Sequence, residues 1–497
     1  MQSTKTQNKQ NMKKILLTLV VSLQAIVLAA TTIDDFQTMK TKLGEKSLPI
    51  VNLTVDIASV SKPNYTNATI EIADPLRRTD GENVETMLSC KVKYRGNTSL
   101  RYDKKSFNIK LLNEKGKSLD KAMFGMREDD AWILDAMAID RVRMRNRLNF
   151  DTWNAMSSTP YATDYDSRNG TQGLFVELFI NGKYHGLYCF TDKINRKLLG
   201  VKKAETAADG STTIKGVLYK GDQWSDATRL NGYYDQDMNG ASWNEWELDY
   251  PDDYPCAEAY TPLKNFIDYC VDSSDADFEE KIDENFYFDN FRDYQVFVLS
   301  QGLRDNLMKN TFLSIVNINK GHCMMITPWD LDCSLGGEWD GSYHSDVATF
   351  SELQSVGLYR RLWNDNVRNF QVAVADRWRL LNRDVLSEEA FCQRVDSFAN
   401  AFIESGAWQR EYEMWNGNPV ELKQNLNDET DYIKSWYHSN RQNIKNVLFH
   451  GIASGIDGVK EDCGEQRPHV LYNVFGQRVG ENYKGIIVEN GRKMLRK

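Results

Sequence analysis

Acidic and amide side chains between Leu303 and Asp332 have the types and the spacing that phosphoryl transfer needs. Asp305 is followed five residues later by Asn310, and a second acidic pair, Asp330 and Asp332, comes after an alternating apolar and polar run. Phosphoryl transfer requires one carboxylate near the attacking hydroxyl and two hard oxygen ligands for Mg²⁺. We therefore expect Asp305 to be the catalytic base, Asn310 and Asp330 to be metal ligands, and Asp332 to be a further ligand or to support one.

The spacing of Asp305 and Asn310 is a weak signal by itself, because a chain rich in Asp and Asn shows it by chance. In the alternative interpretation these two residues cap turns and Asp330 begins a surface loop. The context favours the functional interpretation. An apolar helical stretch, Phe286–Leu303, ends just before Asp305, and a strand and a turn at 319–321 then lead to the second acidic pair.

A basic loop between two predicted strands carries groups that complement phosphate. A glycine with free backbone N–H groups, hydroxyls and several cations together suit a triphosphate. The alternative is an ordinary basic turn on a solvated sheet edge. The residues of this loop are Arg95, Gly96, Asn97, Thr98, Ser99, Lys104 and Lys105.

The elements that must position these groups change character along the chain. Alternating apolar residues predict strands in the first half, and Asn181-Gly182 between two such runs predicts a hairpin. The second half shows helical periodicity, which indicates an α+β protein with a cleft between two parts. The predicted strands include 51–55, 92–94, 107–111, 131–134 and 217–220, and the predicted helices are 139–156, a start at 192–201, 262–270, 286–303, 356–381, 387–403 and 422–448.

Two further segments have open interpretations. Residues 222–255 are rich in Trp and Tyr, and they form either a stacking surface or an insertion that packs on its own aromatic residues, which we favour. Four arginines recur in the predicted helix over 139–156, where such side chains are usually solvated or paired with surface acids, although one of them could reach the cleft. They are Arg141, Arg143, Arg145 and Arg147.

Composition and the N-terminus bound the class of protein. Residues 1–30 combine lysines, an apolar run of about 16 residues and small residues at 29–30, which predicts a cleaved secretory signal rather than a membrane anchor of ~20 residues. The remaining chain carries 57 basic and 70 acidic residues, a net charge of -13, so we expect no nucleic-acid partner and no anionic membrane. The eight cysteines form no C-x-x-C pair, so a zinc knuckle is not expected.

Six blocks, taken in order, resemble the spore-coat protein H (CotH) family of secreted atypical kinases. They are YRGNTS…KKSFNIKL, WILDA…DRVRMRN, FVELFINGKYHGLYCFTDKI, LYKGD, DN…KN and PWDLD, and they span about residues 50–370. The resemblance implies a divergent protein-kinase-like two-lobe fold, with a β-rich N-lobe, a helical C-lobe, and ATP with Mg²⁺ in the cleft between them.

The resemblance also assigns roles to single residues. Asp305 matches the catalytic Asp, Asn310 the metal-side Asn and Asp330 the metal-binding Asp of the family. The loop Arg95–Ser99 matches the phosphate side, and Asp192 lies where an adenine-facing hinge is expected, although family members commonly have Glu there. For the lysine that binds the phosphates of ATP, the resemblance implies Lys105 as the first candidate and Lys220 as the second.

The domain organisation follows from these observations. We expect a signal peptide at 1–30, a kinase-like domain at 31–451, a polar linker at 452–468 and a small three-stranded β module at 469–497. That tail resembles C-terminal β modules of secreted Bacteroidetes proteins, which often act in sorting to the surface.

The leading hypothesis is an exported kinase that transfers the γ-phosphoryl of Mg-ATP to Ser or Thr hydroxyls of another exported protein. It would act in the periplasm, at the cell surface or outside the cell, without a membrane span after signal cleavage. One alternative is a catalytically silent kinase-like protein for surface binding or adhesion. Another is ATP-dependent transfer to a glycan or small molecule, which shares the same metal site.

Overall fold

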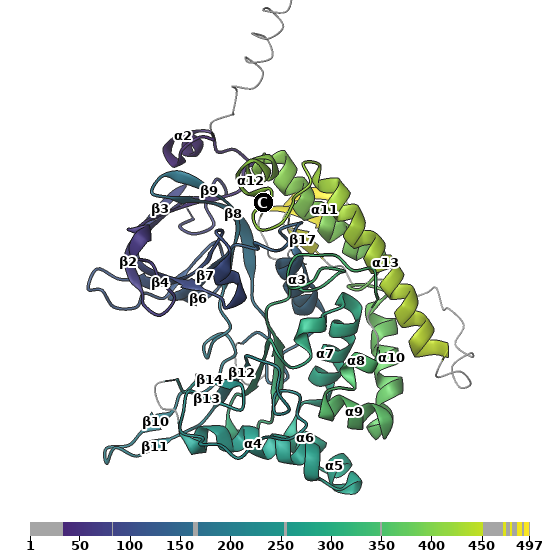
Figure 1. Ribbon diagram of the computed structural model, residues 1–497. Coiled ribbons are helices and arrows are strands. Elements are labelled where there is room, and N and C mark those ends of the chain that lie inside the picture. The colour runs from purple at the N-terminus through teal and green to yellow at the C-terminus, as the bar shows by residue number, and fades with distance from the viewer. Residues whose placement is uncertain are drawn as a thin grey trace, which may run out of the picture.

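The computed structural model describes residues 33–450, apart from 82, 163–166, 253–255 and 348–349, and four short strand segments between 471 and 496. Figure 1 shows a β-barrel of early strands on one side, a second sheet below it, and the later helices along the other side. The predicted order, a β-rich first half followed by a helical second half, is confirmed, and the fold is mixed α+β. The signal segment 1–30 and the linker 452–468 lie outside the described residues.

The first half closes into a barrel with the strand order β1-β2-β3-β4-β7-β9-β8. Closure comes from the parallel pairing of β1 with β8, in which Ile50 lies opposite Glu177 and Leu53 opposite Ile180. Alternate residues, such as Val92 and Ile109, fill the interior with buried, mostly apolar side chains. The sequence predicted the strands but not their closure. The strands are β1 (Ile50–Thr54), β2 (Thr66–Ala73), β3 (Glu85–Arg95), β4 (Ser106–Leu112), β7 (Ala131–Asp135), β8 (Gly173–Ile180) and β9 (Lys183–Asp192).

The predicted hairpin at Asn181-Gly182 is confirmed as the connection between β8 and β9. Both residues have positive φ, 52° and 78°, as a two-residue hairpin turn of the type favoured by Asn-Gly requires. This hairpin matters for the site because the last residues of β9 form part of its wall.

A second, antiparallel sheet has the order β13-β14-β12-β15-β16. The predicted strand over 217–220 is β12, and it pairs directly with β15, so that Leu218 lies opposite Ser314. The Trp- and Tyr-rich insertion contributes β13 and β14 to the same sheet. Its strands are β12 (Val217–Gly221), β13 (Ser242–Trp243), β14 (Trp246–Tyr250), β15 (Thr311–Ile315) and β16 (Met325–Pro328).

Helices lie below and beside the second sheet, and α12 and α11 lie along the right-hand side of the barrel (Figure 1). Predicted helix 356–381 is divided into α9 and α10, because Asn366, Arg368 and Asn369 adopt positive φ between them. Helix α12 was not predicted. The helices are α2 (Phe36–Thr41), α3 (Arg145–Met156), α4 (Ala257–Asp272), α5 (Asp275–Glu280), α6 (Ile282–Asn285), α7 (Phe288–Gln301), α8 (Phe350–Leu353), α9 (Gly357–Asn364), α10 (Phe370–Leu381), α11 (Glu388–Glu404), α12 (Ala407–Trp415) and α13 (Leu426–His450).

One helix prediction is confirmed only in part, and another is wrong. The expected helix over 139–156 begins only at Arg145, because the Asp140 carboxylate accepts hydrogen bonds from the backbone N–H groups of Val142, Met144 and Arg145 and holds a turn there. Residues 192–201 form a strand end and turns, with the Asn195 side chain accepting from Leu198 N–H. In both places a short polar side chain bonds to the backbone and competes with the helix.

The expectation that the four arginines are solvated is also wrong for three of them. Arg143, Arg145 and Arg147 are buried, and each is held by an acid or by backbone carbonyls. Arg143 contacts Glu411, Arg145 contacts Asp140, and Arg147 contacts Asp151. These arginines join the barrel to the helices.

The C-terminal segments form a sheet of order β18-β17-β19-β20, one strand more than predicted, with β17 (Leu471–Asn473), β18 (Arg478–Val479), β19 (Gly485–Glu489) and β20 (Arg492–Arg496). The seven cysteines in the described part of the chain are free thiols. Within those same residues, no helix combines the length and the apolar character that a membrane span requires.

Candidate active site

The turn that carries Asp305 follows α7 directly. Gly302 ends the helix in the left-handed conformation, with φ 64°, and the short 3₁₀ turn Arg304–Asn306 comes next. The Asn310 side chain donates to Asp305 Oδ2 at 2.8 Å, and Lys309 Nζ contacts both Asp305 oxygens at 2.9 and 2.8 Å. The structure therefore brings Asp305 and Asn310 together as the sequence spacing predicted.

The second acidic pair reaches the same place through the hairpin of β15 and β16. Trp329 N–H donates to Asn310 O at 2.9 Å, and the buried Asn306 side chain donates to Trp329 O at 2.6 Å and to Asn310 O at 3.1 Å. These bonds tie the turn that carries Asp305 to the segment that begins the Asp330-Leu331-Asp332 sequence. The segments that carry Asp305, Asn310, Asp330 and Asp332 are therefore held side by side.

The carboxylates of Asp330 and Asp332 have no hydrogen bond or ion pair to any residue that the structure describes. The side chain of Asp330 is exposed to solvent, and that of Asp332 is half-buried. Loss of water to the surrounding protein raises the pKa of Asp330, Asp135 and Asp305 raise it further, and Arg95 acts in the opposite direction. The same loss of water, together with the charge of Asp330, raises the pKa of Asp332 well above its usual range. Two adjacent unpartnered carboxylates suit a divalent cation.

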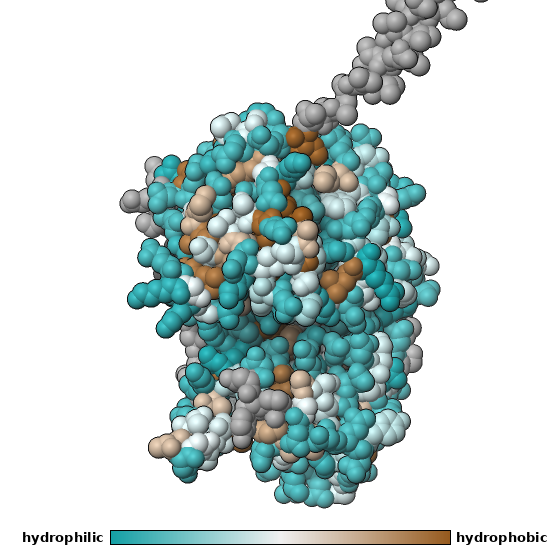
Figure 2. Space-filling model, turned by 60° about the vertical axis from the view of Figure 1, so that its left-hand side comes forward, coloured by the Kyte–Doolittle hydropathy of each residue, from teal (hydrophilic) through white to brown (hydrophobic). Residues whose placement is uncertain are grey.

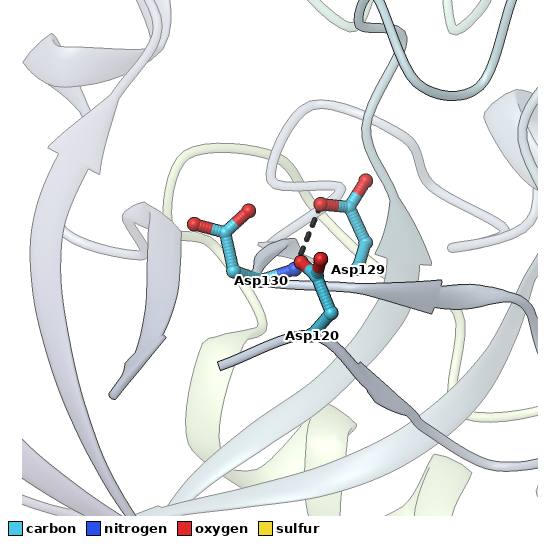
Figure 3. A group of neighbouring side chains, drawn as sticks. All are labelled: Asp120, Asp129 and Asp130. Carbon is cyan, nitrogen blue, oxygen red and sulfur yellow. Dashed lines mark hydrogen bonds between the residues drawn. The ribbon is translucent and has the colours of Figure 1, made fainter. Parts of the chain in front are cut away.

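The tightest group of acids in the described chain lies elsewhere. Asp120, Asp129 and Asp130 bring carboxylate oxygens within 4.8 Å of one another (Figure 3). Lys197 Nζ contacts these three acids at 2.5, 3.5 and 3.1 Å, and Arg127 pairs with Asp129. This group is already neutralised by cations, so it is an ion-pair network at the barrel edge.

The predicted metal ligands are less tightly clustered than that network. Mg²⁺ usually keeps several waters and is held by one or two carboxylates together with substrate phosphates. The pair Asp330 and Asp332, with the Asn310 side chain nearby, therefore fits Mg²⁺ without a closed cage of protein oxygens.

The basic loop lies at the end of β3 and reaches the acidic segment through Arg95, whose guanidinium lies 5.3 Å from the centre of the Trp329 ring. Gly96 has φ 107°, and a Cβ atom there would lie 1.9 Å from Ser99 Oγ, so only glycine fits this turn. Asn97 precedes a 3₁₀ turn, Thr98–Arg101, that continues the loop.

The two lysines predicted to grip ATP are both engaged. Lys105 Nζ donates to Leu100 O at 2.9 Å and to Tyr102 O at 2.6 Å. Its ammonium group therefore stabilises the conformation of the loop by binding two of the loop's own carbonyls. Lys220 in β12 pairs with Asp222 at 2.9 Å and Glu247 at 3.2 Å, and its charge also lowers the pKa of Asp330. Lys220 therefore faces the acidic segment, whereas Lys105 supports the loop.

Asp192 differs from its expected role. Its side chain is 0% exposed, accepts from Gln172 N–H at 2.7 Å and pairs with Arg127 at 3.3 Å. Burial raises the pKa of this carboxyl, and Arg127 offsets part of the increase. The neighbouring Thr191 lines the pocket instead, so the carboxylate of Asp192 supports the wall and does not face the pocket.

A small recess lies between the barrel, α3 and the Trp329 segment. Apolar atoms come from Ile133, Phe150, Cys189 and Trp329, and polar groups from Arg95, Asp135, Asn146, Arg147, Thr171 and Thr191. Figure 2 shows a recessed band across this face, between the upper part that holds the barrel and the lower part that holds the second sheet.

Three contributors to the site were missed in the sequence. Lys309 lies four residues after Asp305, a spacing that predicts an ion pair on one helical face. Asp135 and Asn146 line the pocket, and they stand in a sequence block noted above without assigned roles. No periodic pattern distinguishes Asp135 or Asn146 from surface residues.

The comparison with known proteins covers most of these elements. The family model described as CotH kinase protein matches residues 92–444, from within β3 to within α13. The match begins later and ends later than the resemblance over about 50–370. No curated protein matches the chain.

Proposed function

The chain belongs to the CotH kinase protein family, and from that membership and the geometry of the site we propose that it is an ATP-dependent kinase with an exported protein acceptor. The family implies a phosphotransferase-like enzyme. We propose that the γ-phosphoryl of ATP moves to a Ser or Thr hydroxyl, and that the barrel and the helical part form two kinase-like lobes around the pocket.

The observation that carries this proposal is the meeting of two acidic segments, the turn after α7 and the residues that follow β16. Asp305, held by Asn310 and Lys309, lies beside two carboxylates that have no partner among the described residues. In a protein without a metal, that arrangement only adds repulsion to the folded state. A bound divalent cation would be attracted to both carboxylates and would remove the repulsion between them.

Each group then has a chemical task. Asp305 would accept the proton of the attacking hydroxyl, and Asp330, Asp332 and the Asn310 side chain would hold Mg²⁺. Arg95 and the loop at Gly96 face the phosphates with positive charge and backbone N–H groups. The bound Mg²⁺ and ATP would supply charge neutralisation and the transferable phosphoryl group.

The acceptor is the part of the proposal with a second candidate, a glycan hydroxyl. The centre of the Trp224 ring lies 5.7 Å from Lys309 Nζ, which is 2.8 Å from Asp305 Oδ2, so the ring centre is within 8.5 Å of that oxygen. Trp224 is 38% exposed. An exposed ring so close to the base offers a stacking surface to an acceptor.

The test begins with nucleotide binding. Calorimetric titration of residues 31–497 with ATP, with Mg²⁺ or with EDTA, is expected to show metal-dependent binding that Asp330→Asn loses. Asp384→Asn removes one exposed carboxylate far along the chain and is the matched control. Absence of binding in wild-type protein under both conditions would reject the kinase and favour the silent binding protein.

The acceptor class is tested next. The protein is incubated with γ-labelled ATP and with exported proteins of the organism that produces it, and the label is measured before and after enzymatic removal of glycans. Label that survives deglycosylation and is released by a protein phosphatase supports a Ser or Thr acceptor. Label that leaves with the glycans identifies the second candidate.

A further inference from the structure

Leu331, the residue between the two acids, is held by side chains from one distant helix. Its backbone N–H donates to Asn146 Oδ1 at 3.1 Å, and its backbone carbonyl accepts from Asn149 Nδ2 at 2.9 Å. Both asparagines belong to α3. Each peptide group on the two sides of this residue is therefore fixed by the same element.

The orientation of the Asn146 amide is itself fixed by Asp135 at the end of β7. Asp135 Oδ2 accepts a hydrogen bond from Asn146 Nδ2 at 2.8 Å. Because an ionised carboxylate can only accept, the NH₂ group of Asn146, and not its oxygen, must face Asp135. The amide oxygen is consequently left facing Leu331 N–H. Asp135 is held in turn by Ser106 Oγ at 3.3 Å and Met137 N–H at 3.2 Å.

The segment needs this support because of its backbone. Asp330 adopts φ 56°, a left-handed conformation that few non-glycine residues occupy, directly before the Leu331 peptide. Leu331 itself is 0% exposed and anchored in the core. Rotation of the peptide between Asp330 and Leu331 would turn the two carboxylates apart.

Packing alone does not explain the chain of bonds. Asp135 and Asn146 are half-buried and line the pocket, where water could replace either hydrogen bond at little loss of stability. The bonds are directional instead. They connect the pocket wall, through one amide, to the peptide that aims the acids.

We propose that Asp135 and Asn146 are positioning residues for a divalent-metal site at Asp330 and Asp332. The proposal rests on the proposed function, in which those two acids hold the metal, and extends it to the residues that set their geometry. Residues that orient metal ligands typically change metal affinity by 10- to 100-fold when they are replaced. We expect about a tenfold loss of affinity here.

The experiment uses Mn²⁺ alone, titrated into residues 31–497 and followed by electron paramagnetic resonance of the free ion. Asn146→Asp places two carboxylates face to face, and Asp135→Asn removes the orientation of the amide. Each single variant is expected to raise the Kd for Mn²⁺ about tenfold. The control is Asn154→Ala, which removes one bond from α3 to Thr171 O and should leave the Kd within twofold of wild type.

The double variant with Asp135→Asn and Asn146→Asp exchanges donor and acceptor and rebuilds the same chain of bonds. An amide at position 135 can donate to a carboxylate at position 146, which still accepts from Leu331 N–H. Recovery of the wild-type Kd to within about threefold supports the proposal. A general folding defect predicts instead that the double variant is at least as weak as the singles.

Other outcomes overturn the proposal. They are a wild-type protein that binds no Mn²⁺, single variants with unchanged Kd, or losses matched by Asn154→Ala. If wild-type protein binds Mn²⁺ and the exchange rescues it, but no ATP binds, the kinase function fails while the positioning role stands.

Discussion

A buried charge cluster joins α12 to the barrel, and its disruption should be the most destabilising single change near the site. Glu411 Oε1 contacts Lys104 Nζ at 2.5 Å and Arg143 Nε at 2.7 Å, and Oε2 accepts from Leu187 N–H at 2.7 Å. The side chains of Lys104, Arg143 and Glu411 are all 0% exposed. Lys104 is also the penultimate residue of the basic loop.

Glu411→Gln keeps the shape of the side chain but offers one acceptor where three donors converge. At least one buried cation or backbone N–H is then unpaired. Removing one partner from a buried ion pair typically destabilises a protein by ~3–5 kcal/mol. Total stabilities are commonly about 5–15 kcal/mol, so the variant would be marginal.

The effect should depend on pH, with a sign that follows from the burial of Lys104. The pKa of Lys104 is lowered from its ordinary 10.5 to about 7. Burial is the main cause; Glu411 opposes it, and Arg143 adds to it. The unfolded chain therefore binds this proton more tightly between about pH 7 and 10.5, and stability rises with pH across that window. Without Glu411 the pKa falls again, so the variant is penalised most at pH 6, and its difference from wild type narrows toward pH 10.

The assay is urea denaturation followed by tryptophan fluorescence at pH 6, 8 and 10. Asp396→Asn breaks an exposed pair with Lys434 and serves as the control, with an expected change below about 1 kcal/mol. A loss in Glu411→Gln no larger than in this control, or one that grows with pH, would refute the reasoning.

Three shorter predictions concern the site itself. Asp305→Asn should abolish phosphoryl transfer while the Kd for Mg-ATP stays within a few-fold, because it removes the base and not the metal ligands; a large loss of ATP affinity by calorimetry would contradict this. Asp332→Asn should raise the thermal midpoint of the metal-free protein at pH 8 and not at pH 4, because the raised pKa of Asp332 means that folded-state stability falls as pH rises above the ordinary value near 3.8; calorimetry in EDTA tests the sign, and a lower midpoint at pH 8 would count against it. Gly96→Ala should weaken ATP binding at least tenfold because its Cβ meets Ser99 Oγ, whereas Gly116→Ala, with φ 71° and open space around it, should leave binding unchanged; equal effects of the two alanines would exclude this steric explanation.

Local signals in the sequence were sufficient for the parts of the site that are close in the chain. Asp305 and Asn310 are one turn apart, and an Asn-Gly turn connects β8 to β9, so residue type and spacing alone predicted both arrangements. The alternation of apolar residues likewise predicted most strands, because the period of two is a property of the chain itself. Helix boundaries at Arg145 and Asn366 were missed where side chains or left-handed residues interrupt the backbone pattern.

The tertiary structure alone decided which distant residues support those parts. Closure of the barrel depends on the register between β1 and β8, and the metal-side segment depends on Asn146, which lies 185 residues before Leu331. Glu411 meets Arg143 across 268 residues. Such partners leave no periodic trace, because a hydrogen bond or ion pair constrains two positions and says nothing about the residues between them. The sequence by itself therefore determined which residue types are available for the chemistry that we propose, and the folded chain determined which distant residues hold the acidic segments in place.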